Sequence, residues 1–168
     1  ENKNRKTCKL LFFESTENPI FHNYITLNFN VNYIEESSDG KLLLATNKGL
    51  YLLDGKKNIL KLITGTAKLN IRSIVRTGAD EIWIATYEKG FYLHKQNILH
   101  SFPLDKNGYL ATSHFFMEDK KGFFWIPTNK GLFQVKKNDL LEYTKNPRQN
   151  IYYHYYNKES GFLTNEFN

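Results

Sequence analysis

The sequence has 168 residues, of which 40% are hydrophobic and 24% charged, and its formal net charge is +6. These totals predict one ordinary globular domain and exclude a membrane-spanning segment, which requires about 20 consecutive apolar residues. An excess of positive charge is compatible with a nucleic-acid partner, but the lysines occur as scattered pairs beside turn residues. We therefore expect solvated loops, no nucleic acid and no direct contact of this segment with a membrane.

Cysteine and histidine usage gives no sign of a metal site. Cys8 is the single cysteine, so no internal disulfide can form, and the five histidines do not fall at ligand spacing. The chain opens with polar residues, and if the protein is exported we expect its signal segment to have been removed. We expect neither a metal nor another cofactor.

In chain order, the first 30 residues contain two β-rich runs, KLLFFES and YITLNF. A stretch of sixteen residues that ends in a threonine then occurs three times, beginning at Val31, Ile71 and Ser113. The repeated residues, about 41 positions apart, are Thr46, Thr86 and Thr128, followed by Gly49, Gly90 and Gly131. A fixed period of this length indicates a repeat architecture.

Each unit consists of short apolar runs separated by polar turns, without the 3.6-residue spacing of helical repeats. After the threonine come a glycine turn, a third run and a weaker fourth run, ILKLI, ILHSF and DLLEYT. Three or four antiparallel strands that are apolar on both faces predict one blade of a β-propeller. Pro127 lies inside such a run and removes a ladder donor, so we expect a strand edge or a local bulge there.

The predicted fold class is all-β, a partial β-propeller of repeated three- to four-stranded antiparallel blades. Three units are too few for closure, which usually takes about 4–8 blades. We expect a segment of a longer propeller, or one that is completed by association. The predicted boundaries are a partial blade at 1–30, blades at 31–70, 71–112 and 113–150, and the start of a further blade at 151–168.

The units YIEESSDGKLLLATNKGL, IVRTGADEIWIATYEKGF and FMEDKKGFFWIPTNKGL resemble the two-component regulator propeller repeat. The C-terminal YYHYYNKESGFLTNEFN resembles the segment that follows these repeats in the periplasmic sensor region of bacterial hybrid histidine kinases. The departures are Leu43 in place of tryptophan, a missing glycine in the second unit, and Pro127. They leave the fold prediction unchanged.

The resemblance implies a periplasmic ligand-sensing module, with a transmembrane helix and a histidine kinase elsewhere in the parent protein. Such sensors commonly respond to oligosaccharides, so an oligosaccharide ligand is implied. We expect the other blades of the same protein as neighbours, and a homodimer whose equilibrium shifts when the ligand binds.

No catalytic motif occurs in the sequence, which lacks GxSxG, HExxH and a glycine-rich phosphate loop. The carboxylate pairs Glu35–Glu36 and Glu118–Asp119 recur at the end of the expected first strand of two units. This recurrence favours a structural role in the turn over glycoside hydrolysis. We expect no catalytic residue and no enzymatic activity in this segment.

Candidate ligand-binding residues lie where each unit begins. Asn32, Arg72 and His114 are the second residues of the three units, and they differ from blade to blade as a specific site requires. Tyr87 lies in the loop TYEKG, which is one residue longer than its sister loops, and its ring could stack on a sugar. The alternative for all four is an ordinary solvent-facing position.

Trp83 and Trp125 occupy the repeat position that faces the next blade, so we expect core packing there and not ligand stacking. A passive scaffold propeller that binds protein partners, without a small-molecule ligand, is the alternative function. A hydrolase or lyase would require carboxylates, tyrosines or histidines that converge on the channel from different blades.

Overall fold

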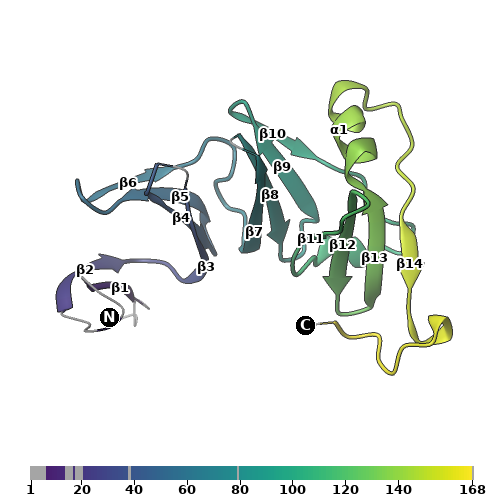
Figure 1. Ribbon diagram of the computed structural model, residues 1–168, viewed down its shortest axis with the longest axis horizontal. Coiled ribbons are helices and arrows are strands. Elements are labelled where there is room, and N and C mark those ends of the chain that lie inside the picture. The colour runs from purple at the N-terminus through teal and green to yellow at the C-terminus, as the bar shows by residue number, and fades with distance from the viewer. Residues whose placement is uncertain (1–6, 14–16, 18–20, 38, 79, 168) are drawn as a thin grey trace, which may run out of the picture.

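The computed structural model describes residues 7–13, 17, 21–37, 39–78 and 80–167. Within these residues the chain forms three four-stranded antiparallel sheets and one two-stranded sheet. The sheets follow one another along the chain and stand side by side (Figure 1). The predicted all-β class with repeated blade-like sheets is confirmed.

The N-terminal hairpin consists of β1 (Cys8–Phe13) and β2 (Phe21–Leu27). The first four-stranded sheet has the order β3 (Val31–Glu36), β4 (Leu42–Thr46), β5 (Gly49–Asp54) and β6 (Ile59–Leu62). Apolar side chains of the hairpin cover one face of this sheet around Leu44 and Leu53. The hairpin therefore takes the place that a preceding blade would occupy.

The second and third sheets repeat the first in strand order. The second consists of β7 (Ile71–Gly78), β8 (Glu81–Thr86), β9 (Phe91–Lys95) and β10 (Ile98–Ser101). The third consists of β11 (Met117–Glu118), β12 (Phe123–Thr128), β13 (Gly131–Lys136) and β14 (His154–Tyr156). Short 3-10 helices at Tyr109–Ala111 and Lys158–Ser160 precede and follow the third sheet.

Two expectations for the C-terminal part are wrong. The run DLLEYT, expected as a fourth strand, lies in helix α1 (Lys137–Lys145). Leu140, Leu141 and Tyr143 all pack against one core cluster, which a strand could not achieve because its neighbouring residues point to opposite faces. β14 pairs with β13 instead, so residues 154–156 complete the third sheet and do not begin a further blade.

The repeated threonine closes a tight turn in each sheet. Its hydroxyl donates to the carbonyl oxygen of the turn glycine, at 2.7 Å for Thr46–Gly49, 2.6 Å for Thr86–Gly90 and 2.8 Å for Thr128–Gly131. All three threonines are fully buried. At Gly49 the φ angle is +127°, and a Cβ there would lie 2.8 Å from the carbonyl oxygen of Thr66. The turn therefore favours a glycine at positive φ and a side chain with a hydroxyl group opposite it.

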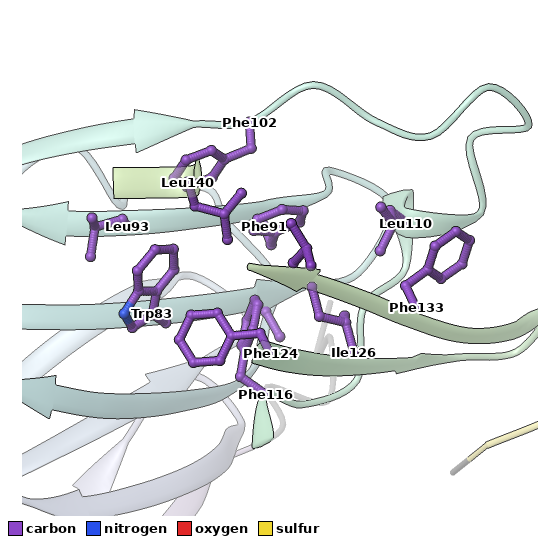
Figure 2. Packing of buried hydrophobic residues seen from close by; sticks show 12 residues of the cluster. Trp83, Phe91, Leu93, Phe102, Leu110, Phe116, Phe124, Ile126, Phe133 and Leu140 are labelled. Carbon is purple, nitrogen blue, oxygen red and sulfur yellow. The ribbon is translucent and has the colours of Figure 1, made fainter. Parts of the chain in front are cut away.

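The largest core lies between the second and third sheets. Trp83 and Phe91 of the second sheet meet Phe124 and Phe133 of the third in one buried cluster (Figure 2). Trp83 is fully buried, and its ring centroid lies 4.8 Å from that of Phe124 in an edge-to-face arrangement. The prediction that Trp83 packs against the next blade is confirmed. A second buried cluster fills the space between the first and second sheets.

Pro127 lies inside β12, where it pairs with Leu132 of β13 in a regular register. No bulge occurs in this pairing. On its other side Pro127 faces the irregular segment around His114, whose amide donates to the Pro127 carbonyl oxygen at 3.0 Å. The regular pairing of β11 is confined to Phe124 and Trp125. The missing amide hydrogen is tolerated because it falls in this gap of the ladder.

Candidate functional site

Asn32, Arg72 and His114, the three predicted strand-start residues, each lie where the pairing of the first strand of a sheet is interrupted. The register between β3 and β4 shifts at Asn32, and the register between β7 and β8 shifts at Arg72. In the third sheet, His114 follows the isolated Ser113–Thr128 bridge, before the regular pairing of β11 begins. A bulge bends its strand and redirects the side chain of the extra residue.

Two side chains at this end join neighbouring sheets. The Asn32 amide donates to the carbonyl oxygen of Ile71 at 2.6 Å, from the first sheet to the second. The Ser73 hydroxyl donates to the carbonyl oxygen of His114 at 2.7 Å, from the second sheet to the segment that enters the third. The structure thus gives Asn32 a role in joining two sheets.

Arg72 and Tyr87 lie together at the same end of the second sheet. The guanidinium carbon of Arg72 is 5.4 Å from the centroid of the Tyr87 ring, which is 42% exposed. The backbone amide of Tyr87 donates to the carbonyl oxygen of Asn70 at 2.8 Å and so fixes the start of the loop. A cation over an exposed aromatic face stabilises the pair by about 0.5–1 kcal/mol.

His114 lies beside this pair. Its Nε2 is 2.7 Å from the amide oxygen of Asn129, and because that oxygen accepts, Nε2 carries the proton. Its Nδ1 is buried and has no hydrogen-bond partner among the described residues. Burial and the charge of Arg72 lower the pKa of His114 below its usual 6.5, against the opposing effects of Asn129 and Glu166. The imidazole is therefore neutral at neutral pH.

Lysines contribute positive charge to this end. The residue before each turn glycine is a lysine, namely Lys48, Lys89 and Lys130. The Lys48 ammonium donates to the carbonyl oxygen of Asn28 at 3.3 Å, and the Lys89 ammonium donates to that of Lys68 at 3.4 Å. These lysines hold the segments that lead into β3 and β7.

The C-terminal segment returns to the same end of the third sheet (Figure 1). The backbone amide of Phe167 donates to the carbonyl oxygen of Thr128 at 3.2 Å. This return brings the carboxylate of Glu166 close enough to act on the pKa of His114. Residues far apart in the sequence therefore meet around the imidazole.

A groove of about 530 Å³ lies at the opposite end of the second and third sheets. Glu81 and Glu118 line it, and the Lys137 ammonium lies 3.9 Å and 3.0 Å from their oxygens. Burial raises the pKa of Glu81, but hydrogen bonds from Lys95 and Thr77 and the nearby lysine charges hold it below its usual 4.5. An ionised and paired carboxylate does not match a general acid, which needs a raised pKa.

Asp119 has the structural turn role that its recurrence predicted. Its Oδ1 accepts from the backbone amides of Lys121 and Phe123, at 2.8 Å and 3.0 Å. Its Oδ2 accepts from the Trp125 indole at 2.9 Å. Across the part of the chain that the structure describes, no group of three or more His, Cys, Asp or Glu residues is placed to hold a metal ion.

Comparison with solved structures supports the propeller-like fold. The extracellular domain of a protein assigned to the hybrid two-component systems of B. thetaiotaomicron matches 76% of this chain, with a TM-score of 0.53 and 18% identity. Virginiamycin B lyase from Staphylococcus aureus matches 89% of it, with a TM-score of 0.55 and 10% identity. The chain spans 18% of the first structure and 45% of the second.

No protein-family model matches the sequence, and no curated protein matches it significantly. The fold thus defines the chain as a propeller-like segment that is shorter than half of either matched structure. No helix within the described ranges has the length and apolar character needed to cross a bilayer.

The sequence predicted four site residues at the strand starts and in the longer loop. The structure brings Arg72, Tyr87 and His114 together, whereas Asn32 lies at the preceding sheet junction. Sequence reasoning missed Asn129, the hydrogen-bond partner of the imidazole. The signal was present, because Asn129 is the repeat equivalent of Tyr87 and follows the same threonine.

Proposed function

We propose that the chain is part of the periplasmic ligand-sensing propeller of a hybrid two-component system, and that it binds an oligosaccharide without chemical turnover. The observation that carries this proposal is the meeting of Arg72, Tyr87 and His114 at one end of two sheets. A guanidinium and an exposed aromatic ring suit sugar hydroxyls and ring faces. The likeness in fold to the extracellular domain of a two-component system supports the sensor class.

The open face of the third sheet, in this proposal, packs on another blade of the same protein. Trp125 and Leu132 of that face are half-buried, whereas the equivalent Trp83 and Phe91 of the second sheet are fully buried. The side chains of a repeat need a neighbouring sheet on each face. This half-buried apolar face is therefore of the kind that one more blade would cover.

The segment after the third sheet supports the same proposal. Leu69 and Leu110 precede the second and third units, and both are buried in the cores between sheets. Leu163 stands at the corresponding place in the segment GFLTN, and it is 97% exposed. A further sheet would bury this leucine as the second and third sheets bury theirs.

Signalling in this proposal uses the junction between sheets. A ligand that contacts two neighbouring sheets binds one relative arrangement of them better than another. That difference in affinity shifts the equilibrium between two arrangements of a homodimer, and the change of arrangement is transmitted across the membrane to the kinase.

The test is calorimetric binding of oligosaccharides, released from several polysaccharides by partial hydrolysis, to the 168-residue chain. We expect saturable binding, and recovery of the ligand unchanged after long incubation. Tyr87→Ala should weaken binding, whereas Tyr152→Ala, which removes an exposed tyrosine beside β14, should not. Binding of no oligosaccharide would contradict the proposal, and recovery of cleaved fragments would favour an enzyme.

A passive scaffold that binds protein partners is the second candidate, and the half-buried apolar face of the third sheet favours it. The parent gene distinguishes the two functions. Further repeats, an apolar span and a histidine-kinase domain around this segment would support the sensor. A short open reading frame without a membrane span would support the scaffold.

A further inference from the structure

Arg72 is a half-buried residue whose guanidinium lacks an acceptor among the described residues. Among the described residues it contacts the Tyr87 ring, but no hydrogen bond or ion pair reaches its N–H donors. Arg76, further along β7, shows the ordinary arrangement, because its Nη1 donates to the carbonyl oxygen of Glu36 at 3.0 Å. The nitrogens of the Arg72 guanidinium are not among the buried atoms, so an acceptor from outside the chain can reach its free N–H donors.

The loop that carries Tyr87 holds this guanidinium in place. The amide of Tyr87 donates to Asn70, before β7, and the amide of Glu88 donates to the Thr112 hydroxyl at 3.3 Å. The loop is therefore attached to the segments that enter both the second and the third sheet. A guanidinium positioned on such a ring loses little conformational freedom when a ligand binds.

The surroundings of Arg72 favour a negatively charged group. His114 beside it is neutral, with its proton on Nε2 toward the amide oxygen of Asn129. Lys89 lies in the same loop as Tyr87, and its ammonium is held at the carbonyl oxygen of Lys68. The carboxylate of Glu166 acts on His114 and is the opposing charge in this group.

We propose that Arg72 is the anion-binding residue of the ligand site, that Tyr87 positions its guanidinium, and that the oligosaccharide carries an oxyanion, either a carboxylate or a sulfate. The planar guanidinium can donate two parallel hydrogen bonds to such a group. This inference rests on the proposed oligosaccharide-sensing function and names the class of its ligand.

The experiment compares acidic oligosaccharides with their own neutral counterparts. Uronate-containing oligosaccharides from pectin, alginate and glycosaminoglycans are titrated into the 168-residue chain before and after chemical reduction of their carboxylates to hydroxymethyl groups. Sulfated oligosaccharides are titrated before and after desulfation. We expect at least one acidic ligand to bind saturably, and its neutral counterpart to bind at least about tenfold more weakly, as for a lost charged hydrogen bond.

Three variants assign the effect to the guanidinium. Arg72→Ala should weaken binding of the acidic ligand by about tenfold or more and remove its preference over the neutral counterpart. Arg72→Lys should retain part of the preference, because the charge remains but the paired donors are lost. Arg76→Ala removes an arginine of the same strand that already has an acceptor, and it should leave the preference unchanged.

The outcomes separate this inference from the proposed function. Binding of neutral oligosaccharides with no gain from an oxyanion would overturn the inference and leave the sensor proposal intact. An acidic ligand whose preference survives Arg72→Ala would also overturn it, because another residue would then hold the anion. If no oligosaccharide binds at all, both fail.

Discussion

The second and third sheets come from closely similar sequence units, yet they differ in how much of each strand is buried. From Trp83 to Thr86, every residue of β8 is buried. Along β12 the burial alternates, with Phe124 and Ile126 buried and Trp125 half-buried between them. The second sheet has a neighbour on both faces, whereas the third has a four-stranded neighbour on one. The repeat thus specifies two apolar faces, and the neighbouring sheets decide which of them is buried.

The largest expected effect tests this difference at the two tryptophans. Trp83→Ala should lower the free energy of unfolding by about 3–5 kcal/mol, because it opens a cavity against Phe102 and Phe124. Trp125→Ala should cost clearly less, about 1–2 kcal/mol, since one side of its ring faces solvent and Tyr156. Urea denaturation of both variants measures the difference.

Equal losses at the two tryptophans would break the comparison. They would mean that the third sheet is covered in solution, for instance by a second copy of the chain. Measuring both variants at several protein concentrations decides this, because a loss that depends on association varies with concentration.

The turn threonines provide a second comparison of the second and third sheets. Here we expect the substitution in the third sheet to lower the free energy of unfolding more. The Thr128 hydroxyl donates to Gly131 and also accepts from the amides of Lys130 and Gly131, each at 3.1 Å. The Thr86 hydroxyl, in the longer loop, donates to Gly90 at 2.6 Å. Thr128→Val should therefore cost about 2–3 kcal/mol and Thr86→Val about 1–2 kcal/mol by chemical denaturation.

The opposite order for the two valine variants would show that loop length, and not the number of hydrogen bonds, governs the turn. Threonine-to-serine variants are the control. Serine keeps the hydroxyl, so these variants should recover most of the lost stability.

The sequence predicted the strands and turns of the repeat well, because a buried threonine and a glycine at positive φ leave little choice of residue. It failed at α1, where the pattern of DLLEYT fits a strand as well as a helix. The decision there comes from the core: Leu140 and Leu141 reach the same cluster only from a helix. Local propensity cannot contain that information.

The candidate site was predictable in part for a similar reason. Arg72 and His114 could be found because each is the second residue of its repeat unit. The structure has a register shift at Arg72 and at the equivalent Asn32 of β3. The contribution of Glu166 could not be found, because it depends on how the C-terminal segment folds back. Long-range returns of this kind leave no periodic signal in a sequence.

The second sheet differs from its neighbours by a buried histidine, His94, which should make its stability depend on pH. The equivalent residues are Leu53 in the first sheet and Val135 in the third, both buried. His94 is 5% exposed, and neither ring nitrogen has a hydrogen-bond partner among the described residues. Burial lowers the pKa of His94 below its usual 6.5, with Asp80 opposing this shift and His100 adding to it.

A folded-state pKa below the unfolded value means that protonation favours the unfolded chain. The contribution of the neutral, buried His94 to the free energy of unfolding is therefore fully present above pH 6.5. It is lost as the pH falls from 6.5 toward the lower pKa of the folded state. We expect the unfolding free energy to fall as the pH decreases from about 7 to about 5, with a slope of at most about 1.4 kcal/mol per pH unit for each histidine. His94→Leu should remove most of this loss, and the remainder belongs to His114, whose pKa is also lowered.

One carboxylate affects this measurement at about pH 5, because burial raises the pKa of Glu35 above its usual 4.5, against the opposing charge of Arg76. Protonation of Glu35 therefore favours the folded chain and partly offsets the loss. The pKa values of Glu81 and Asp119 lie below 4.5 and 3.8, so both stay ionised throughout the window. An unchanged pH slope in His94→Leu would show that the imidazole is not buried as a neutral group.

The smallest effect concerns the hydrogen bonds that join one sheet to the next. Ser73 is 4% exposed, and its bond to the carbonyl oxygen of His114 is buried, so Ser73→Ala should cost about 1 kcal/mol. Asn32 is exposed, and water can replace its bond to Ile71, so Asn32→Ala should cost about 0.5 kcal/mol or less. Thermal unfolding should resolve these as shifts of about 2–4 °C and less than about 2 °C. A larger shift for Asn32→Ala than for Ser73→Ala would mean that the smaller core, between the first and second sheets, depends more on its junction than the core around Trp83 does.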